Sequence, residues 1–192
     1  MKPGTRNLNH KEMKQLWSPW RSVHINDTVR GNEDREEKQS IFSRLHQSGQ
    51  DEENLILWRG DTVFVIMNLY PYNNGHLLIV PFREVAHYEA LDPDEMTEMA
   101  QTVDLCIRAI KACMRPDGIN VGMNLGKAAG AGIPEHIHMH VVPRWHGDTN
   151  FMPTLAETKV VPEALKDTYH KLRKTMAHMK IAVSQSSDKE EN

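Results

Sequence analysis

The segment "EHIHMHVVPRW", residues 135–145, has histidine at every second position of its first half. Successive side chains of a β-strand point to opposite faces, so His136, His138 and His140 would share one face. The other face then carries an apolar set that can be buried: Ile137, Met139 and Val141. This alternation predicts a strand with one face in the core and three imidazoles turned outward into a cleft.

Both metal binding and phosphate chemistry suit such a row of imidazoles. Histidines on a strand are known zinc ligands, but no Cys-x-x-Cys accompanies them. Instead, the glycine-rich loop "GKAAGAGIPE", residues 126–135, precedes them, and its backbone N–H groups and Lys127 could hold an anion. Upstream lie side chains suited to hydroxyl and phosphate groups: Asn68, His76 and Asn124. These neighbours favour phosphate chemistry over a metal cage.

The segment "HIHMHVV", residues 136–142, matches at all seven positions the signature His-φ-His-φ-His-φ-φ, in which φ is apolar. This signature is that of the histidine triad (HIT) family. The segment "VIMNLYPYNNGHLLIVPFR", residues 65–83, resembles the nucleoside-binding strand pair of that family. The segment "NLGKAAGAGIPEHIHMHVVPRWHGDTNFMP", residues 124–153, is similar to the bacterial branch that includes diadenosine tetraphosphate phosphorylases. The resemblance spans roughly residues 40–180.

The resemblance implies a separate catalytic role for each histidine. His138 matches the nucleophile, and His140 matches the residue that hydrogen-bonds the scissile phosphate and the leaving side. His136 matches the structural member of the triad. The chemistry is sound, because a neutral imidazole with a pKa of about 6.5 is a good nucleophile near neutral pH. Its attack on the α-phosphorus would form a nucleotidyl-histidine intermediate.

The same resemblance implies a set of nucleotide contacts. Asn68 matches the ribose-binding residue, His76 matches a histidine near the pocket, and Asn124 matches a residue that touches a phosphate or bridging oxygen. The loop before the triad supplies the remaining expected contacts: Gly126, Lys127, Gly132 and Ile133.

Two positions depart from the family pattern. Many bacterial relatives carry Cys-Ile-Phe-Cys, half of a zinc site, where this chain has "SIFS", residues 40–43. Hydroxyls are poor zinc ligands, so we expect no metal at His87 and His136, and magnesium only as a companion of the bound nucleotide. The second departure is Gly132, where relatives often have a Ser or Gln that assists the leaving group.

The pattern of the remaining sequence predicts an α+β fold. Strands are expected over residues 54–60, 62–68, 76–82 and 119–126, in addition to the histidine segment. A long amphipathic helix follows Asp92 and Pro93, which suit its first positions. The resemblance implies the HIT-like arrangement, an antiparallel sheet of about five strands with one long helix packed on it and a further C-terminal helix.

Composition and charge bound the remaining possibilities. The 192 residues carry a net charge of −3, which does not suit a duplex-binding protein. No segment resembles a signal peptide or a membrane span, and Cys106 and Cys113 suit a reducing cytoplasm. We expect a polar N-terminal extension (residues 1–39), the HIT domain (40–150), a C-terminal extension with a helix (151–183) and a disordered tail (184–192).

The leading functional hypothesis is cleavage of dinucleoside polyphosphates through His138, by phosphorolysis or by hydrolysis. One alternative is a purine-nucleotide-binding protein that hydrolyses AMP-phosphoramidates or has only vestigial catalysis. Another is a metal-dependent hydrolase. The resemblance further implies a homodimer formed through the long helix and its adjoining strand.

Overall fold

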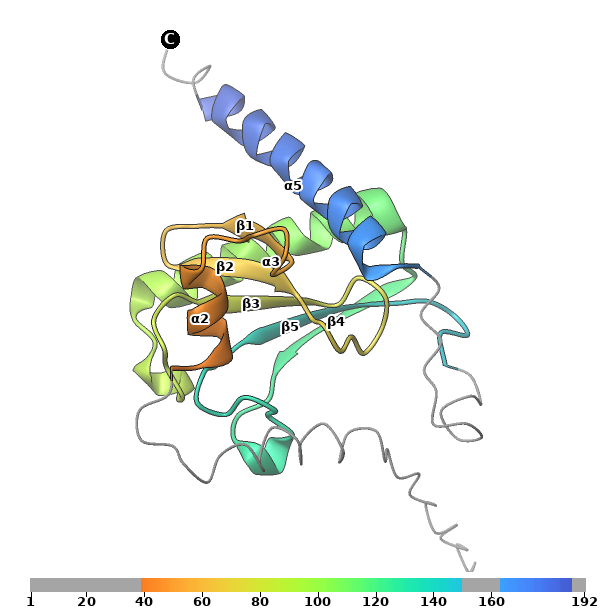
Figure 1. Ribbon diagram of the computed structural model, residues 1–192. Helices are drawn as coiled ribbons and strands as arrows, with labels where there is room; N and C mark the ends of the chain where they lie inside the picture. The colour runs from red at the N-terminus through yellow and green to blue at the C-terminus, as the bar shows by residue number, and fades with distance from the viewer. Residues whose placement is uncertain (1–38, 150–162, 188–192) are drawn as a thin grey trace, which may run out of the picture.

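The computed structural model describes residues 39–149 and 163–187, with a five-stranded antiparallel sheet at their centre (Figure 1). The strand order is β1-β2-β3-β5-β4. The strands are β1 (Ile56–Arg59), β2 (Val63–Met67), β3 (Leu77–Pro81), β4 (Gly118–Met123) and β5 (Met139–Arg144). The predicted α+β class and the five strands are confirmed. Of the predicted terminal segments, residues 1–38, 151–162 and 188–192 lie outside the described residues, and the described part, 163–187, contains a C-terminal helix that continues past the predicted boundary at residue 183.

Helices cover both faces of this sheet. The long helix α3 (Pro93–Met114) packs on one face beside α5 (Leu165–Ser187), and the short helix α2 (Ile41–Gln47) lies over the other face (Figure 1). Two single-turn helices, η1 (Tyr88–Ala90) and η2 (Lys127–Ala129), interrupt the connections. None of the described helices is long and apolar enough to cross a membrane.

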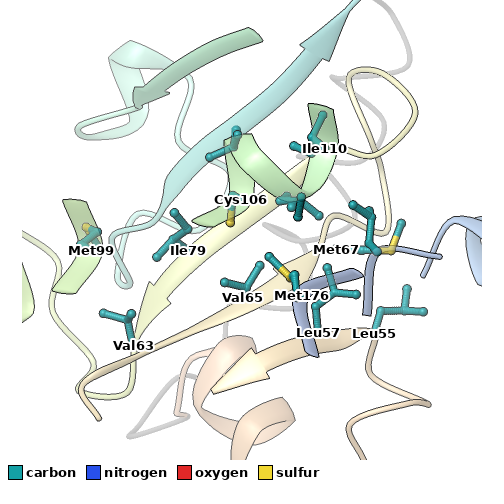
Figure 2. Packing of buried hydrophobic residues seen from close by; sticks show 14 of the residues in the cluster. Leu55, Leu57, Val63, Val65, Met67, Ile79, Met99, Cys106, Ile110 and Met176 are labelled. Carbon is teal, nitrogen blue, oxygen red and sulfur yellow. The ribbon is translucent and has the colours of Figure 1, made fainter. Parts of the chain in front are cut away.

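Alternation along the strands divides the apolar residues between two clusters. The larger cluster joins one face of the sheet to α3 and α5 (Figure 2), with members that include Val63, Val65, Ile79, Cys106, Ile110 and Met176. The smaller cluster lies on the other face under α2, and its buried members are Phe42, Ile56, Phe64, Ile66, Leu78 and Val80. Because the side-chain period of a strand is two residues, β2 and β3 supply apolar residues to both clusters.

Helix α3 begins where the sequence predicts. Asp92 is its N-cap residue, Pro93 is its first residue, and the Glu95 carboxylate accepts the Asp92 backbone N–H at 2.8 Å. The helix ends at Met114, one residue before Arg115 adopts a left-handed conformation with φ 49°. Pro116 then prevents any continuation.

A carboxylate on α3 organises the turn between β1 and β2. The Glu98 side chain accepts backbone N–H groups from Asp61 at 2.8 Å, Thr62 at 2.5 Å and Val63 at 3.1 Å. Burial of the side chain acts to raise the pKa of Glu98, but the bond from the Thr62 hydroxyl and these backbone bonds outweigh it and hold the pKa below its usual value. The turn is therefore tied to the helix that packs across the sheet.

Candidate active site

The three triad histidines lie immediately before and at the start of β5, on the face of the sheet that α2 covers. The predicted division of faces is confirmed for the apolar set, since Ile137 and Val141 are buried in the α3 cluster. The predicted exposure is wrong: His136, His138 and His140 have relative exposures of 0%, 8% and 8%. Phe42 of α2 lies against two of these rings, His136 and His138.

The predicted extent of the histidine strand is also wrong. Strand β5 begins at Met139, so His136 and His138 precede it. Pairing between β3 and β5 starts with Ile79 opposite Met139, and the backbone N–H of Ile137 bonds instead to Val85 O at 2.7 Å. The segment before Met139 therefore leaves the sheet.

His138 is held in one tautomer by the backbone. Its Nδ1 lies 2.8 Å from the carbonyl oxygen of His136. A carbonyl can only accept, so Nδ1 carries the proton, and Nε2 of the neutral ring has a free lone pair. The Phe42 ring contacts the imidazole edge to face, with centroids 5.1 Å apart. An attack by His138 would therefore come from Nε2.

Burial also controls the charge of His138. It lowers the pKa of this ring below its usual value, and the bond to the His136 carbonyl only partly opposes the effect. We therefore expect kcat/KM for nucleotidyl transfer to stay constant as the pH falls through about 6.5, because the buried ring remains neutral there. A pH profile of the initial rate checks this expectation. An acid limb at or above the ordinary histidine pKa would contradict it.

His140 receives its orientation from two residues of the β2–β3 connection. The Tyr72 backbone N–H donates to His76 Nδ1 at 3.0 Å, so His76 carries its proton on Nε2. That Nε2–H donates to His140 Nδ1 at 2.9 Å. In the neutral ring the proton of His140 then lies on Nε2, where it can be donated. The backbone amide of Tyr72 thus determines the tautomer of both rings.

Three of the residues expected to bind nucleotide, Asn68, His76 and Asn124, lie near His140 or one contact away from it. The Asn68 amide nitrogen donates to His76 Nδ1 at 3.3 Å. The Asn124 amide nitrogen lies 3.5 Å from His140 Nε2, a contact between two donors rather than a hydrogen bond. His76 is fully buried behind His140 rather than at the surface of the site. The structure therefore places His76 and Asn124 against His140, and Asn68 behind them against His76.

The glycine-rich loop folds back beside the triad. Gly126 and Gly130, with φ of 79° and 91°, flank η2 and adopt conformations that favour glycine. Gly126, Lys127 and Gly132 are exposed, whereas Ile133 is half-buried against the cluster under α2. A Cβ atom at Gly132 would meet nothing within 4 Å. The loop thus leaves open space next to this position.

His136 has a supporting role that suits its complete burial. Its Nε2 donates to the carbonyl of Pro81 at 2.9 Å, and its Nδ1 lies 3.0 Å from Ser40 Oγ. Both ring nitrogens are therefore occupied by protein groups. In the described part of the chain, no group of three or more His, Cys, Asp or Glu side chains could hold a metal ion. Ser40 and Ser43 have hydroxyls where zinc-binding relatives have thiolates, and hydroxyls are poor zinc ligands. The residues around His136 therefore do not fit zinc.

The structure adds residues that the sequence did not single out. Tyr72 stacks on His140 with centroids 5.5 Å apart and an interplanar angle of 19°. Phe42 packs against His136 and His138, with centroids 5.7 Å and 5.1 Å away. Both aromatic residues lie in segments that resemble the HIT family. Their contacts with the histidines could not be predicted, because these contacts join segments that are far apart in the sequence.

Comparison with known proteins agrees with this geometry. The family model for the HIT domain matches residues 49–147, slightly more than half of the 192 residues. The chain belongs to the HIT family. An AP-4-A phosphorylase of Mycobacterium tuberculosis (strain H37Rv) is 41% identical over 159 residues, which cover 82% of this chain and 81% of that protein. A bis(5'-nucleosyl)-tetraphosphatase (asymmetrical) of Schizosaccharomyces pombe is 30% identical over 111 residues, 58% of each chain.

Solved structures of other HIT proteins share the fold. A zinc-bound histidine triad family protein from Mycobacterium smegmatis has a TM-score of 0.61 at 23% identity, covering 75% of this HIT chain and 97% of its own. A hypothetical histidine triad nucleotide-binding protein from Sulfolobus tokodaii has a TM-score of 0.60 at 24% identity, covering 72% of this chain and 93% of its own. The HIT-like fold is thereby confirmed. Together with the enzymes among its relatives, the triad makes this chain a HIT-family enzyme.

Proposed function

We propose that this HIT protein cleaves dinucleoside polyphosphates such as diadenosine tetraphosphate by nucleotidyl transfer to His138. The observation that carries the proposal is the bond of 2.8 Å between His138 Nδ1 and the His136 carbonyl. It leaves Nε2 as the reactive nitrogen beside the proton-bearing Nε2 of His140. The similarity to an AP-4-A phosphorylase over most of the chain supports the choice of substrate.

The first chemical step forms a P–N bond and breaks a P–O bond. His138 Nε2 attacks the α-phosphorus of diadenosine tetraphosphate, and ATP leaves with its bonding electron pair. His140 donates its Nε2 proton to the leaving oxygen or stabilises its charge. The product on the enzyme is adenylyl-His138.

The second step breaks the P–N bond and restores His138. Inorganic phosphate as the acceptor releases ADP, whereas water releases AMP. The Gly-rich loop, with exposed Lys127 and open space at Gly132, is our candidate for holding the phosphate groups. Because 41% identity links the chain to a phosphorylase, we favour phosphate as the acceptor.

Product analysis tests the function directly. The purified protein is incubated with diadenosine tetraphosphate, with and without inorganic phosphate, after dialysis against a chelator and readdition of magnesium. We expect ADP and ATP only when phosphate is present. AMP and ATP in both reactions would instead identify a hydrolase. Binding without any product would favour a nucleotide-binding role, and recovery only after zinc addition would favour a metal-dependent hydrolase.

The same proposal includes a homodimer and a cytoplasmic location. Among the described residues β4 pairs only with β5, so β4 forms an edge of the sheet, and Val121 on it is 44% exposed. An open edge can pair with the same strand of a second copy. Sedimentation is expected to give twice the chain mass of 22.0 kDa.

The proposed cytoplasmic location rests on the cysteines. The free thiols of Cys106 and Cys113 suit a reducing cytoplasm.

A further inference from the structure

A hydrogen-bonded cluster of two buried serines and the exposed residue Glu84 joins the start of α2 to the segment that follows β3. One oxygen of Glu84, Oε2, accepts the backbone N–H of Ser40 at 2.8 Å and the hydroxyl of Ser43 at 2.9 Å. The two serines have relative exposures of only 1% and 3%. The carboxylate therefore satisfies two buried donors that lie more than 40 positions away in sequence.

The hydroxyl of Ser40 extends this cluster to the triad. Because His136 Nε2 donates to the Pro81 carbonyl, Nδ1 of the neutral ring must accept. Ser40 Oγ, 3.0 Å away, thus donates its proton to His136 Nδ1. The same oxygen accepts the backbone N–H of Phe42 at 3.2 Å as the N-cap of α2. Each bond of Ser40 has a defined direction.

Two supports of His138 depend on the position of this cluster. The His136 carbonyl holds His138 Nδ1, and Phe42, the second residue of α2, packs on the His138 ring. Helix α2 has only seven residues, too few to be stable by itself. Its position must come from tertiary contacts, and Glu84 supplies two of them.

We propose that Glu84 is a positioning residue for the nucleophile His138, acting through Ser40, Ser43 and the placement of α2. Among the described residues Glu84 accepts hydrogen bonds from Ser40 and Ser43 and not from a triad histidine, although its charge partly opposes the lowering of the His136 pKa by burial. Its effect is on the orientation of the His138 ring, so it changes the chemical step rather than substrate affinity. Orientation of a nucleophile is sensitive, since a displacement of about 1 Å costs a factor on the order of 100 in rate. The kinetic part of this proposal rests on the proposed function.

Variants at Glu84 separate positioning from general stabilisation. Glu84→Ala removes the acceptor, and we expect the single-turnover rate of adenylyl-His138 formation to fall about 10- to 100-fold with KM changed only a few-fold. Glu84→Gln keeps an oxygen that accepts both bonds and should recover most of that rate. Glu89→Ala, at an exposed carboxylate in η1, is the matched control and should behave as the wild type.

A measurement made without substrate tests the positioning role of Glu84 separately from the proposed function. Nitrogen-15 NMR of the ligand-free protein reports which ring nitrogen of His138 is protonated. We expect the Nδ1-protonated form in the wild type, Glu84→Gln and Glu89→Ala, and a mixture of tautomers in Glu84→Ala. If the wild type forms no adenylyl-histidine but shows this NMR pattern, only the proposed function fails.

Several results would overturn the positioning role. One is an unchanged tautomer and rate in Glu84→Ala. Another is a Glu84→Gln variant as impaired as Glu84→Ala. If Glu84→Ala does not fold, Ser43→Ala, which removes one of the two bonds, must still lower the rate severalfold at unchanged KM. A wild-type rate in Ser43→Ala would then overturn the role.

Discussion

Replacement of His138 by asparagine is expected to abolish turnover of diadenosine tetraphosphate, a loss on the order of 10⁴-fold or more, as for other deletions of a nucleophile. The asparagine amide can still donate a proton to the His136 carbonyl, which His138 Nδ1 contacts at 2.8 Å in the wild type. The fold and the pocket should therefore persist while the attacking nitrogen is lost. Nucleotide affinity, measured by calorimetry, is expected to change only a few-fold.

The matched control is His170→Asn, because His170 is exposed on α5, which packs on the opposite face of the sheet from the triad. It should retain the wild-type rate. The proposed function fails if His138→Asn keeps turnover comparable to that of the control. It is also contradicted if an adenylyl group is trapped on the His138→Asn protein.

Replacement of His76 by phenylalanine is expected to lower kcat about 10²- to 10³-fold, although His76 is fully buried and does not face the substrate. His76 Nε2–H determines that His140 Nδ1 accepts, and this leaves the proton of His140 on Nε2. Phenylalanine retains the ring volume but removes that donor, together with the acceptor for the Tyr72 N–H. These lost bonds should also lower the free energy of unfolding by about 1–3 kcal/mol.

The leaving group offers a sharp test of this second prediction. If His140 donates a proton to the leaving oxygen, a nucleotide ester with a 2,4-dinitrophenolate leaving group needs that proton less, because this phenolate is a much weaker base than the terminal phosphate of ATP. The His76→Phe defect should then be much smaller for the ester than for diadenosine tetraphosphate. An equal defect with both substrates would contradict proton donation by His140. His178→Phe on α5, where His178 is exposed, is the control.

Local sequence was sufficient for the elements whose signals are contained within a few residues. The start of α3 follows from Asp92 and Pro93, because an N-cap and a first-turn proline act on their own helix. Ile137 and Val141 face away from the histidines because successive side chains of an extended backbone point to opposite sides. Helix α2 was not predicted, because its short sequence has no clear helical period and its position depends on Glu84.

Sequence by itself therefore determined the fold class, the family and the position of the three histidines that we propose to carry the chemistry. Only the tertiary structure decided what each imidazole bonds to. His76 meets His140 across 64 positions, and Ser40 meets His136 across 96. A ring nitrogen takes or gives a proton according to the group placed opposite it, and that group is chosen by how distant segments cross. The three histidines share one motif, yet their tautomers, burial and roles come from different partners.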